Sequence, residues 1–385
     1  MKFPKGFLFG SATSAHQIEG GNYNSDWYSW EKFSGKKGVS ETSKIACDSW
    51  HKWQEDIDLL EQSGQNAYRF SIEWAKIEPE EGVFNKEAID HYRKILETLR
   101  KRQIQPLVTL FHFSLPLWLA NKGGLTNLKS SYYFQRFATK IAEELGSLID
   151  FCTILNEPNV YTLKGYIQGD WCPGEQSKYK AFIVFCNLIF CQNRAAKAIK
   201  KILPSAQVGL AMNIAVYEPA NDTFSNRLRV WATKMIAHRL FLHTVMKKCD
   251  FLGINHYMKF RIEPSGRAVM LGEEKNDFGW GICPESLYEV IRENAGWKKP
   301  IYITEHGIAD ASDSKRAQFL KDALSAIGEA IKENIPVKGY FYWSLLDNFE
   351  WDQAYKMKFG LFTIDRAPRD SANVYKKLIE KYQEK

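Results

Sequence analysis

The sequence predicts an α/β protein with a (β/α)8 TIM barrel that spans residues 1–385 as a single domain. Two observations predict it. Eight short β-rich apolar runs recur along the chain, and segments with apolar residues three and four positions apart lie between them. Strands that alternate with helices are typical of parallel βαβ units, and eight such units favour a closed barrel over an open doubly wound sheet. No glycine-rich phosphate loop follows any of the runs, which weakens the open sheet further.

The apolar runs supply the strands, in chain order. They are rich in Val, Ile, Phe and Tyr, which suit a pleated and buried surface. Strands of a parallel sheet are buried on both faces, so their sequences need not alternate between apolar and polar residues. We expect the strands within residues 6–13, 67–74, 105–113, 151–158, 207–214, 250–257, 300–307 and 337–347.

Amphipathic segments between the runs supply the helices. The clearest patterns cover residues 86–103, 134–148 and 315–334, and a final amphipathic stretch covers residues 373–385. No Ser/Gly-rich linker divides the chain. One domain is therefore expected.

Composition excludes disorder and gives no support to a nucleic-acid partner. Hydrophobic residues make up 45% of the chain, enough for a sizeable core. The 52 Lys and Arg residues outnumber the 45 Asp and Glu residues, for a net charge of +7, but the charges are interspersed along helical stretches. A nucleic-acid-binding protein would carry a basic stripe or a known binding module, and the sequence indicates neither.

The cysteines and the N-terminus predict a cytoplasmic protein. Seven cysteines lie scattered, several inside apolar runs and without metal-site spacing, which is typical of buried free thiols in a reducing compartment. The first residues contain Pro4 and Gly6 and lack the long apolar region of a signal peptide. No stretch reaches the roughly 18 apolar residues of a membrane span, so we expect no membrane partner.

Polar residues gather at the C-terminal ends of the expected strands, where (β/α)8 barrels hold their active sites. Two of them, Glu157 and Glu305, would face each other across the barrel mouth. Paired carboxyl groups can hydrolyse a glycosidic bond: a separation of about 5 Å favours retention of configuration, and about 6.5 to 9.5 Å favours inversion. The sequence leaves that separation open. The strand-end residues are Arg69, Glu73, His112, Asn156, Glu157, Asn255, Tyr257, Glu305, Trp343, Asp347, Glu350 and Trp351.

Motifs that run nearly from end to end resemble those of family 1 glycoside hydrolases, the retaining β-glycosidases of clan A. "NEP" alone is weak, but the shared order and spacing are specific. The motifs are "FLFGSATSAHQIEGG", "YRFSIEWAKIEP", "TLFHFSLPLWL", "LNEP", "DFLGINHY", "YITEHGIAD" and "GYFYWSLLDNFEW" followed by "KFGLF". The resemblance implies an enzyme that hydrolyses small β-glycosides or oligosaccharides from the non-reducing end. Its chemistry needs no metal or organic cofactor.

The resemblance also implies residue roles. Glu157 is the general acid/base and Glu305 the nucleophile that forms a covalent glycosyl-enzyme. The charge of Glu305 would raise the pKa of Glu157, and glycosylation of Glu305 would lower it again. Arg69 is expected to hydrogen-bond Glu305, and Asn255 to lie near both carboxyl groups. The implied substrate-binding residues are Gln17, His112, Asn156, Tyr257, Trp343, Glu350 and Trp351.

Several positions depart from the family pattern. His16 and His256 stand where Tyr is common, and His306 where Asn is common. Cys152 and Ile154 replace the usual Trp and Thr before "NEP", and Leu125 replaces another Trp. The chain is also shorter than most members, with economical connections after Asn213 and between Tyr257 and Glu305. In the family, those segments form the wall of the active site on the aglycone side. We therefore expect the same chemistry with a more open entrance to the active site.

The substrate and the competing interpretations stay partly open. Glu350 and Trp351 favour a non-phosphorylated hexose, because the resemblance links phosphorylated substrates to loss of this pair and because a charged carboxylate at position 350 would repel a phosphate. Glucose, galactose and fucose are all candidates, and transglycosylation competes with hydrolysis. A sugar-binding protein without turnover is the alternative from another class, and the intact Glu157 and Glu305 count against it. A phosphate-binding α/β enzyme lacks any supporting motif. Association into a homo-oligomer is left open.

Overall fold

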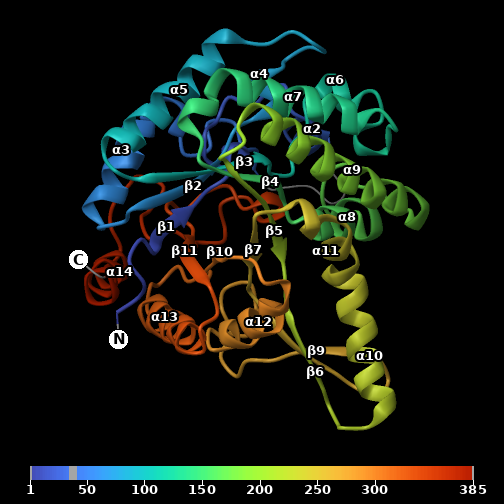
Figure 1. Ribbon diagram of the computed structural model, residues 1–385, viewed down its shortest axis with the longest axis vertical. Helices are drawn as coiled ribbons and strands as arrows, with labels where there is room; N and C mark the ends of the chain where they lie inside the picture. The colour runs from blue at the N-terminus through green and yellow to red at the C-terminus, as the bar shows by residue number, and fades with distance from the viewer. Residues whose placement is uncertain (1, 34–40, 384–385) are drawn as a thin grey trace.

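The computed structural model describes residues 2–33 and 41–383, and these residues form a closed barrel of eight parallel strands (Figure 1). The order around the barrel is β1-β11-β10-β7-β5-β4-β3-β2, with β2 beside β1. Each strand lies within its predicted range, so the predicted fold class is confirmed. The strands are β1 (Leu8–Ala12), β2 (Ala67–Ser71), β3 (Gln105–Phe111), β4 (Phe151–Asn156), β5 (Gln207–Asn213), β7 (Phe251–Asn255), β10 (Ile301–His306) and β11 (Val337–Trp343).

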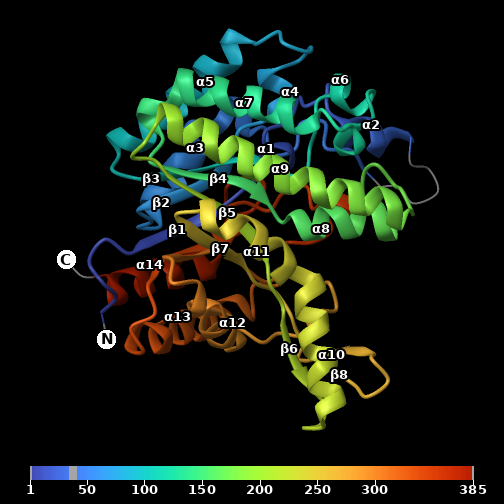
Figure 2. The same ribbon diagram turned by 45° about the vertical axis from the view of Figure 1, so that its right-hand side comes forward.

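Helices surround this barrel (Figures 1 and 2). The longer ones are α3 (Ser49–Gln62), α5 (Lys86–Lys101), α7 (Ser130–Leu145), α9 (Lys178–Ile202), α10 (Phe224–Lys234), α12 (Ser286–Asn294), α13 (Arg316–Lys332) and α14 (Asp370–Tyr382). The shorter ones are α1 (Ala15–Ile18), α2 (Asp26–Phe33), α4 (Trp74–Ile77), α6 (Leu117–Ala120), α8 (Pro158–Thr162) and α11 (Leu240–Val245). Helices α5, α7, α13 and α14 confirm the four predicted helices, with ends shifted by a few residues. Residues 384–385 of the last prediction lie outside the described residues.

Helix α5 shows why such segments become helical. The Asn85 side chain caps its first turn and accepts hydrogen bonds from the backbone N–H groups of Glu87 and Ala88, at 3.0 and 3.2 Å. Arg100 and Lys101 lie in the last turn, where positive charge interacts favourably with the helix dipole. The buried residues recur three and four positions apart, at Ile89, Tyr92, Leu96 and Leu99. Local capping and burial of one face therefore favour the same helix.

Apolar side chains form one core between the barrel and the helices and a smaller one inside the barrel. Among the interior residues are Ala67 on β2, Leu107 on β3 and Tyr302 on β10. Two positions further along the same strands, the buried side chains become polar: Arg69, Thr109 and Thr304. This change from apolar to polar layers places hydrogen-bonding groups at the C-terminal end of the barrel.

A small sheet outside the barrel was not predicted. It consists of β6 (Val216–Pro219), β8 (Lys259–Ile262) and β9 (Ala268–Met270), with β6 parallel and β9 antiparallel to β8. These strands lie in the connections that follow β5 and β7. The sequence predicts that these connections are short but predicts no strands in them. Strands of three or four residues are too short to give a clear periodic pattern. In Figure 1 this sheet lies beside α10, away from the barrel axis.

All seven cysteines are free, and five are buried, which confirms the prediction of free thiols. Among residues 2–33 and 41–383, no helix has the length and apolar character needed to cross a bilayer. The same residues contain no cluster of His, Cys, Asp and Glu side chains that could hold a metal ion.

Candidate active site

Glu157 and Glu305 lie at the C-terminal ends of β4 and β10, two strands that β5 and β7 separate in the barrel. Both are nearly buried, with 6% and 4% of their surface exposed. Glu157 has a left-handed backbone, with φ at 41°, and its N–H donates to the carbonyl of Ala211 on β5 at 2.8 Å. A residue with a side chain rarely adopts this conformation, and such residues cluster at functional sites.

Asn255, the last residue of β7, lies between the two acidic strands. Its Nδ2 donates to Glu157 Oε1 at 2.8 Å and to Asn156 Oδ1 at 3.1 Å. The Thr304 hydroxyl donates to Asn255 Oδ1 at 2.7 Å, which orients the amide. Asn156 in turn accepts from Arg69, which also donates to Glu305, so the two acidic side chains share one buried hydrogen-bond network.

Two donors hold the carboxylate of Glu305. Arg69 Nη1 donates to Oε1 at 2.5 Å, and the Tyr257 hydroxyl donates to Oε2 at 2.9 Å. The other guanidinium nitrogens of Arg69 donate to Asn156 Oδ1 at 2.6 Å and to Thr109 Oγ1 at 3.2 Å. Arg69 is fully buried, so its charge acts on Glu305 with little screening by water.

The surroundings of the two carboxyl groups differ. Burial raises the pKa of Glu157 to about 8, and the charge of Glu305 raises it as well, while hydrogen bonds from Asn213 and Asn255 lower it. Burial also raises the pKa of Glu305, but Arg69 and Tyr257 counteract this effect. Glu305, which has the Arg69 cation beside it, is therefore better held in the ionised form. Glu157, which lacks such a cation, is better kept protonated at neutral pH.

Asn156 and His112 form a second part of the network. Asn156 Oδ1 must point at the donors Arg69 and Asn255, so its Nδ2 faces His112 Nε2, at 3.0 Å. His112 Nε2 then accepts this hydrogen bond. Burial and the charge of Arg69 lower the pKa of His112 well below its usual range, so the ring is neutral. Its Nδ1 carries the proton and has no protein partner within the described residues.

Gln17 connects the first βα loop to the loop that follows β11. Its Nε2 donates to the carbonyl of Phe349 at 2.9 Å, to Asn348 Oδ1 at 3.0 Å and to Glu350 Oε2 at 3.3 Å. Burial raises the pKa of Glu350 to about 8, and the charge of Glu305 adds to this rise. Glu350 is therefore mostly protonated at neutral pH, whereas the sequence alone suggested a charged carboxylate.

Aromatic rings complete this side of the site. The His112 ring stacks near Trp343 and Trp351, with centroids 5.9 and 6.2 Å apart. Trp351 also packs against Trp27 at 4.6 Å and Trp171 at 5.6 Å. Trp343 and Trp351 each expose 3% of their surface, so their packing leaves them little freedom to reorient.

Asn213 was not among the predicted site residues. It ends β5, and its Nδ2 donates to Glu157 Oε1 at 3.0 Å. The signal was its place at a strand end, the position that Asn156 and Asn255 occupy on β4 and β7. Unlike Asn156 and Asn255, it lies in no motif shared with the family, so the sequence did not indicate its role.

Two strand-end carboxylates have structural roles. Glu73 follows β2 and caps α4: its Oε1 accepts from the Ala75 backbone at 3.2 Å, and its Oε2 accepts from the Ser114 hydroxyl at 2.8 Å. Asp347 accepts from Arg369 at 2.5 Å and from the Gly360 backbone at 2.9 Å. Neither belongs to the network around Glu157 and Glu305.

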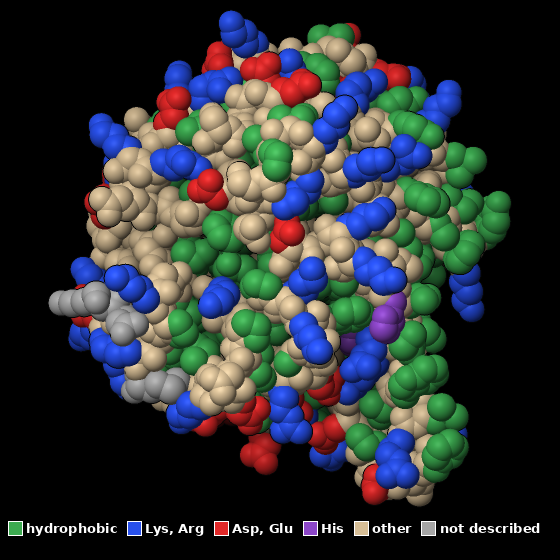
Figure 3. Space-filling model, viewed as in Figure 1, with side chains coloured by type: hydrophobic (Ala, Val, Ile, Leu, Met, Phe, Trp, Pro, Cys, Tyr) green, Lys and Arg blue, Asp and Glu red, His purple; other side chains and the backbone are tan. Residues whose placement is uncertain are grey.

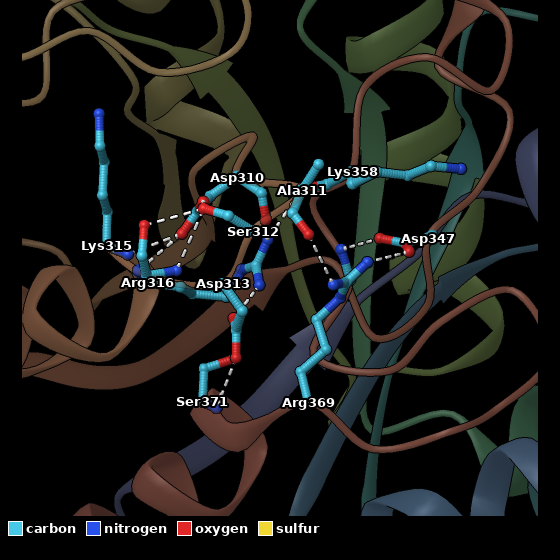
Figure 4. Close-up of polar contacts among 12 residues, drawn as sticks. Asp310, Ala311, Ser312, Asp313, Lys315, Arg316, Asp347, Lys358, Arg369 and Ser371 are labelled. Atoms are coloured by element: carbon cyan, nitrogen blue, oxygen red, sulfur yellow. Dashed lines mark hydrogen bonds and ion pairs between the residues drawn. The ribbon is translucent and has the colours of Figure 1, made fainter.

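Figure 4 shows the polar cluster that joins the loop after β10 to the chain after β11. Arg316 is fully buried; its Nη2 donates to the carbonyls of Asp310 at 2.6 Å and Lys358 at 2.9 Å, and it forms an ion pair with Asp313. Arg369 bonds Asp347 and also donates to the Ala311 carbonyl at 3.1 Å. The loops that follow Glu305 and Trp343 are thus tied to each other.

The three histidines that depart from the family pattern are buried and have partners. His16 Nε2 lies 2.8 Å from Glu31, and its ring stacks on Trp351 with 5° between the planes. His256 contacts the carbonyl of Ile214 and the hydroxyl of Ser286, both at 2.7 Å. His306 lies 3.2 Å from the Tyr340 hydroxyl. The remaining departures, Leu125, Cys152 and Ile154, lie in the core between the barrel and the helices.

A pair of carboxyl groups at the C-terminal end of a βα barrel is the equipment that glycoside hydrolases use, so the site indicates this class of protein. The model of glycosyl hydrolase family 1 matches the chain at residues 1–273 and 243–384. The chain belongs to glycosyl hydrolase family 1 and is a glycoside hydrolase.

Curated relatives match along nearly their whole length. Beta-glucosidase A of Thermotoga maritima is 31% identical, with 98% of each chain covered. Beta-glucosidase A of Acetivibrio thermocellus is 32% identical, again with 98% of each chain covered. These alignments extend over 436 and 440 positions, more than the 385 residues of the chain. The relatives therefore contain segments that this chain lacks, as its economical connections predicted.

Solved structures agree over the whole fold. The beta-glucosidase of Thermotoga maritima in complex with glucoimidazole superimposes with a TM-score of 0.93 at 30% identity, covering 100% of both chains. The same enzyme in complex with galacto-hydroximolactam gives a TM-score of 0.92, also at 30% identity and with 100% of both chains covered.

Proposed function

We propose that this glycoside hydrolase is a β-glucosidase that cleaves non-phosphorylated β-D-glycosides from the non-reducing end with retention of configuration. One observation supports it above all: Glu157 and Glu305 share a buried network in which only Glu305 has a cation beside it. Such a pair supplies one protonated acid and one ionised nucleophile in the same site.

In the first proposed step, a carboxylate oxygen of Glu305 attacks the anomeric carbon and forms a covalent glycosyl ester. Glu157 donates its proton to the departing glycosidic oxygen, so the aglycone leaves as a neutral alcohol. The pKa of about 8 keeps Glu157 protonated at neutral pH. Arg69 and Tyr257 hold the attacking carboxylate in one orientation.

In the second proposed step, the ester removes the negative charge of Glu305. The pKa of Glu157 then falls, because that charge is one of the two causes that raise it. Glu157 can now accept a proton from water as the water attacks the anomeric carbon and the bond to Glu305 breaks. A second sugar that replaces this water gives transglycosylation.

We assign the binding of the terminal sugar to Gln17, His112, Asn156, Trp343, Glu350 and Trp351. The Nδ1–H group of His112 has no partner within the described residues, so it is available to a sugar hydroxyl. Glu350, mostly protonated at neutral pH, can both donate and accept a hydrogen bond. Trp343 supplies an apolar face for the C–H groups of the ring.

A phosphorylated sugar does not suit these residues, although the reason differs from the one first expected. With a pKa of about 8, Glu350 offers little negative charge to repel a phosphate at neutral pH. The side-chain partners that lower this pKa are Gln17 and Trp343, which are both neutral. A buried phosphate dianion beside Glu350 would lack a compensating cation.

The sugar preference follows from the relatives. Curated relatives are named beta-glucosidase, and a Thermotoga maritima structure holds a galacto-configured inhibitor. We therefore rank glucosides first and include galactosides and fucosides as further substrates. The shorter connections favour bulkier aglycones, and turnover of an aryl glucoside, cellobiose and longer oligosaccharides checks this. A strict preference for cellobiose would contradict it.

Three further expectations belong to this proposal. We assign residues 1–385 to a single catalytic domain, since barrel strands extend from Leu8 to Trp343. The free thiols suit a reducing, cytoplasmic location. Neither a nucleic-acid partner nor a cofactor is required by the proposed chemistry, and the oligomeric state is a matter for measurement.

The direct test is a panel of nitrophenyl β-glycosides assayed with the natural protein and with Glu157→Ala and Glu305→Gly. We expect turnover of the glucoside by the natural protein and near-complete loss in both variants. Azide should restore Glu305→Gly and give the α-glycosyl azide, and it should restore Glu157→Ala with the β-glycosyl azide.

A matched control is Glu73→Gln, which removes a buried carboxylate outside the network. It should retain turnover if it folds, as judged by its circular dichroism spectrum. Absence of turnover on every β-glycoside by the natural protein would refute the proposal and favour a sugar-binding protein.

A further inference from the structure

Two helical segments on one side of the molecule contain no acidic residue. Helix α9, residues 178–202, has six Lys and Arg residues and no Asp or Glu, and the same holds for residues 223–249, which include α10 and α11. Four of these twelve basic residues pair with acidic residues outside the two segments. Within the described part of the chain, the other eight form no ion pair.

The same segments expose large apolar side chains. On α10 and the π-helical turn after it, Phe224, Leu228, Trp231 and Ile236 follow one another at intervals of three to five residues. Phe224 is 75% exposed, Trp231 56% and Ile236 80%. Helical spacing places such residues along one stripe. Arg227 and Arg229 flank Leu228 in the sequence, so positive charge borders the apolar stripe.

Helix α9 continues this surface. Phe182 and Phe190 on α9 are exposed, at 66% and 54%. Phe185 of α9 packs against Phe241 of α11 with ring centroids 5.5 Å apart, so the two helices lie side by side. Figure 2 shows α9, α11 and α10 on the same side of the barrel. In Figure 3 hydrophobic side chains gather at the right-hand edge, over α9 and α10, with Lys and Arg beside them.

The charge and apolar character of this surface favour one kind of binding partner over others. Two copies of it would bring together the eight unpaired basic residues of each chain with no acidic residue in either segment to compensate, which disfavours self-association. Single-stranded nucleic acid would stack on the aromatic rings but gain nothing from Leu228 and Ile236. A surface that is negatively charged outside and apolar beneath matches both the basic residues and the apolar stripe.

We propose that the exposed surface of α9, α10 and the π-helical turn 235–239, here named the basic apolar face, docks the protein on anionic lipid bilayers. The apolar stripe enters the boundary between headgroups and acyl chains, and the basic residues contact the anionic headgroups. The expectation of no membrane partner rested on the absence of a spanning segment, and peripheral docking needs none.

Co-sedimentation with vesicles tests the proposal on the full-length protein. We expect it to pellet with vesicles of mixed phosphatidylcholine and phosphatidylglycerol, to pellet far less with phosphatidylcholine alone, and to be released by salt. Arg229→Glu/Arg239→Glu should weaken binding by roughly fivefold or more for each arginine replaced. Trp231→Ser/Ile236→Ser should weaken it by about tenfold or more.

Matched controls lie elsewhere on the surface. Val83→Ser removes another apolar side chain that is 54% exposed, and Lys101→Glu reverses a charge at the end of α5. Both should bind vesicles like the natural protein. All variants should turn over nitrophenyl glucoside equally without vesicles, which separates this proposal from the proposed catalytic function.

Four results would overturn the proposal. The natural protein could fail to pellet with the mixed vesicles, or the face variants could pellet as well as the controls. Light scattering could also show an oligomer that Trp231→Ser/Ile236→Ser disperses, which would assign the face to a second copy. Binding of an oligonucleotide in place of vesicles would assign it to nucleic acid.

Discussion

The guanidinium of Arg69 on β2 lies 2.5 Å from the carboxylate of Glu305 on β10, although these strands are not neighbours in the barrel. The same side chain donates to Asn156 at the end of β4, at 2.6 Å. With its hydrogen bond to Thr109 on β3, Arg69 thus reaches across the barrel and connects β2, β3, β4 and β10 beneath the proposed site. A fully buried cation in this place supports an ionised Glu305, because the ion pair compensates for burial of both charges.

Replacement of Arg69 by Met should therefore impair both stability and catalysis. Loss of one partner of a buried ion pair costs about 3–5 kcal/mol of the free energy of unfolding. The pKa of Glu305 should rise, so the acid-side limb of the kcat/KM profile should move to higher pH, with kcat lower by roughly 100-fold or more. Urea denaturation and pH profiles measure these effects.

Arg69→Lys is the informative comparison, because it keeps the charge but loses the forked geometry. It should fall between the natural protein and Arg69→Met in both assays. Arg102→Met, which removes a partly exposed arginine paired with Asp58 and Glu61, should leave the pH profile unchanged. An unshifted acid limb in Arg69→Met would contradict the proposed role.

The buried Glu157 makes a second prediction about pH. Its pKa in the folded protein is about 8, above the ordinary value of 4.5, so the folded state favours the protonated form. This contribution to stability is fully present below about pH 4.5 and is lost as the pH rises through about 8. At pH 9, Glu157→Gln should therefore have a free energy of unfolding higher than that of the natural protein by on the order of 2 kcal/mol, and thermal denaturation should show a higher melting temperature. At pH 5 the two proteins should unfold at similar temperatures.

The basic-side limb of the kcat/KM profile should lie near pH 8 for the same reason. In Glu305→Gln, loss of the negative charge should lower the pKa of Glu157, which carbon-13 NMR of labelled glutamate can measure. It should stay above 4.5, because burial is the larger cause of the shift. An unchanged pKa in this variant would show that the two groups do not interact.

Asn213 provides a third prediction, on a residue that the sequence did not single out. Its donation to Glu157 at 3.0 Å stabilises the ionised form of that carboxyl group. Asn213→Ala should raise the pKa of Glu157, move the basic limb to higher pH and reduce the rate of the second step, for which Glu157 must act as a base. Because a hydrogen bond to a charged group contributes more free energy than one between neutral groups, the rate of the second step should fall roughly tenfold.

Pre-steady-state kinetics with a dinitrophenyl glucoside can measure that step, because this leaving group needs no acid. Asn187→Ala is a matched control, since it removes a buried Asn that donates to the carbonyls of Leu125 and Asn127, away from Glu157. If both variants slow the second step equally, the effect is structural and Asn213 has no specific role.

The barrel strands could be predicted because burial on both faces makes each one a short apolar run, and the intervening helices carry a clear period. Most of the candidate site followed from the strand ends and the family motifs. Asn213 was missed because nothing in its own sequence segment marks it. Its significance depends on the position of Glu157 on the neighbouring strand, which only the closed barrel provides.

The basic apolar face was missed for a different reason. The sequence shows Phe224, Leu228 and Trp231 at helical spacing, which is the ordinary pattern of a core-facing helix. Only the fold reveals that Asn226 and Val230 face inward there and that the aromatic side is exposed. Net charge also conceals the feature, because the rest of the chain has 40 Lys and Arg against 45 Asp and Glu, an acidic excess that offsets five of the twelve basic residues in these segments.

Arg316 makes the fourth prediction, on the connection between the two loops beside the proposed site. Its Nε donates to the Tyr342 hydroxyl at 2.9 Å, and its Nη2 donates to the carbonyls of Asp310 and Lys358, one on each side of the junction. Arg316→Met would leave the nearly buried Asp313 carboxylate without its cation, at a cost of about 3–5 kcal/mol.

The loop that contains Glu350 and Trp351 would then be less well fixed, so KM for the glucoside should rise more than kcat falls. Lys315→Met is the matched control: it removes the neighbouring cation, which is 39% exposed, and should change stability by about 0.5 kcal/mol or less. Thermal denaturation and steady-state kinetics on both variants measure the two effects. A destabilised Arg316→Met with unchanged KM would show that the cluster stabilises the fold without positioning the loop.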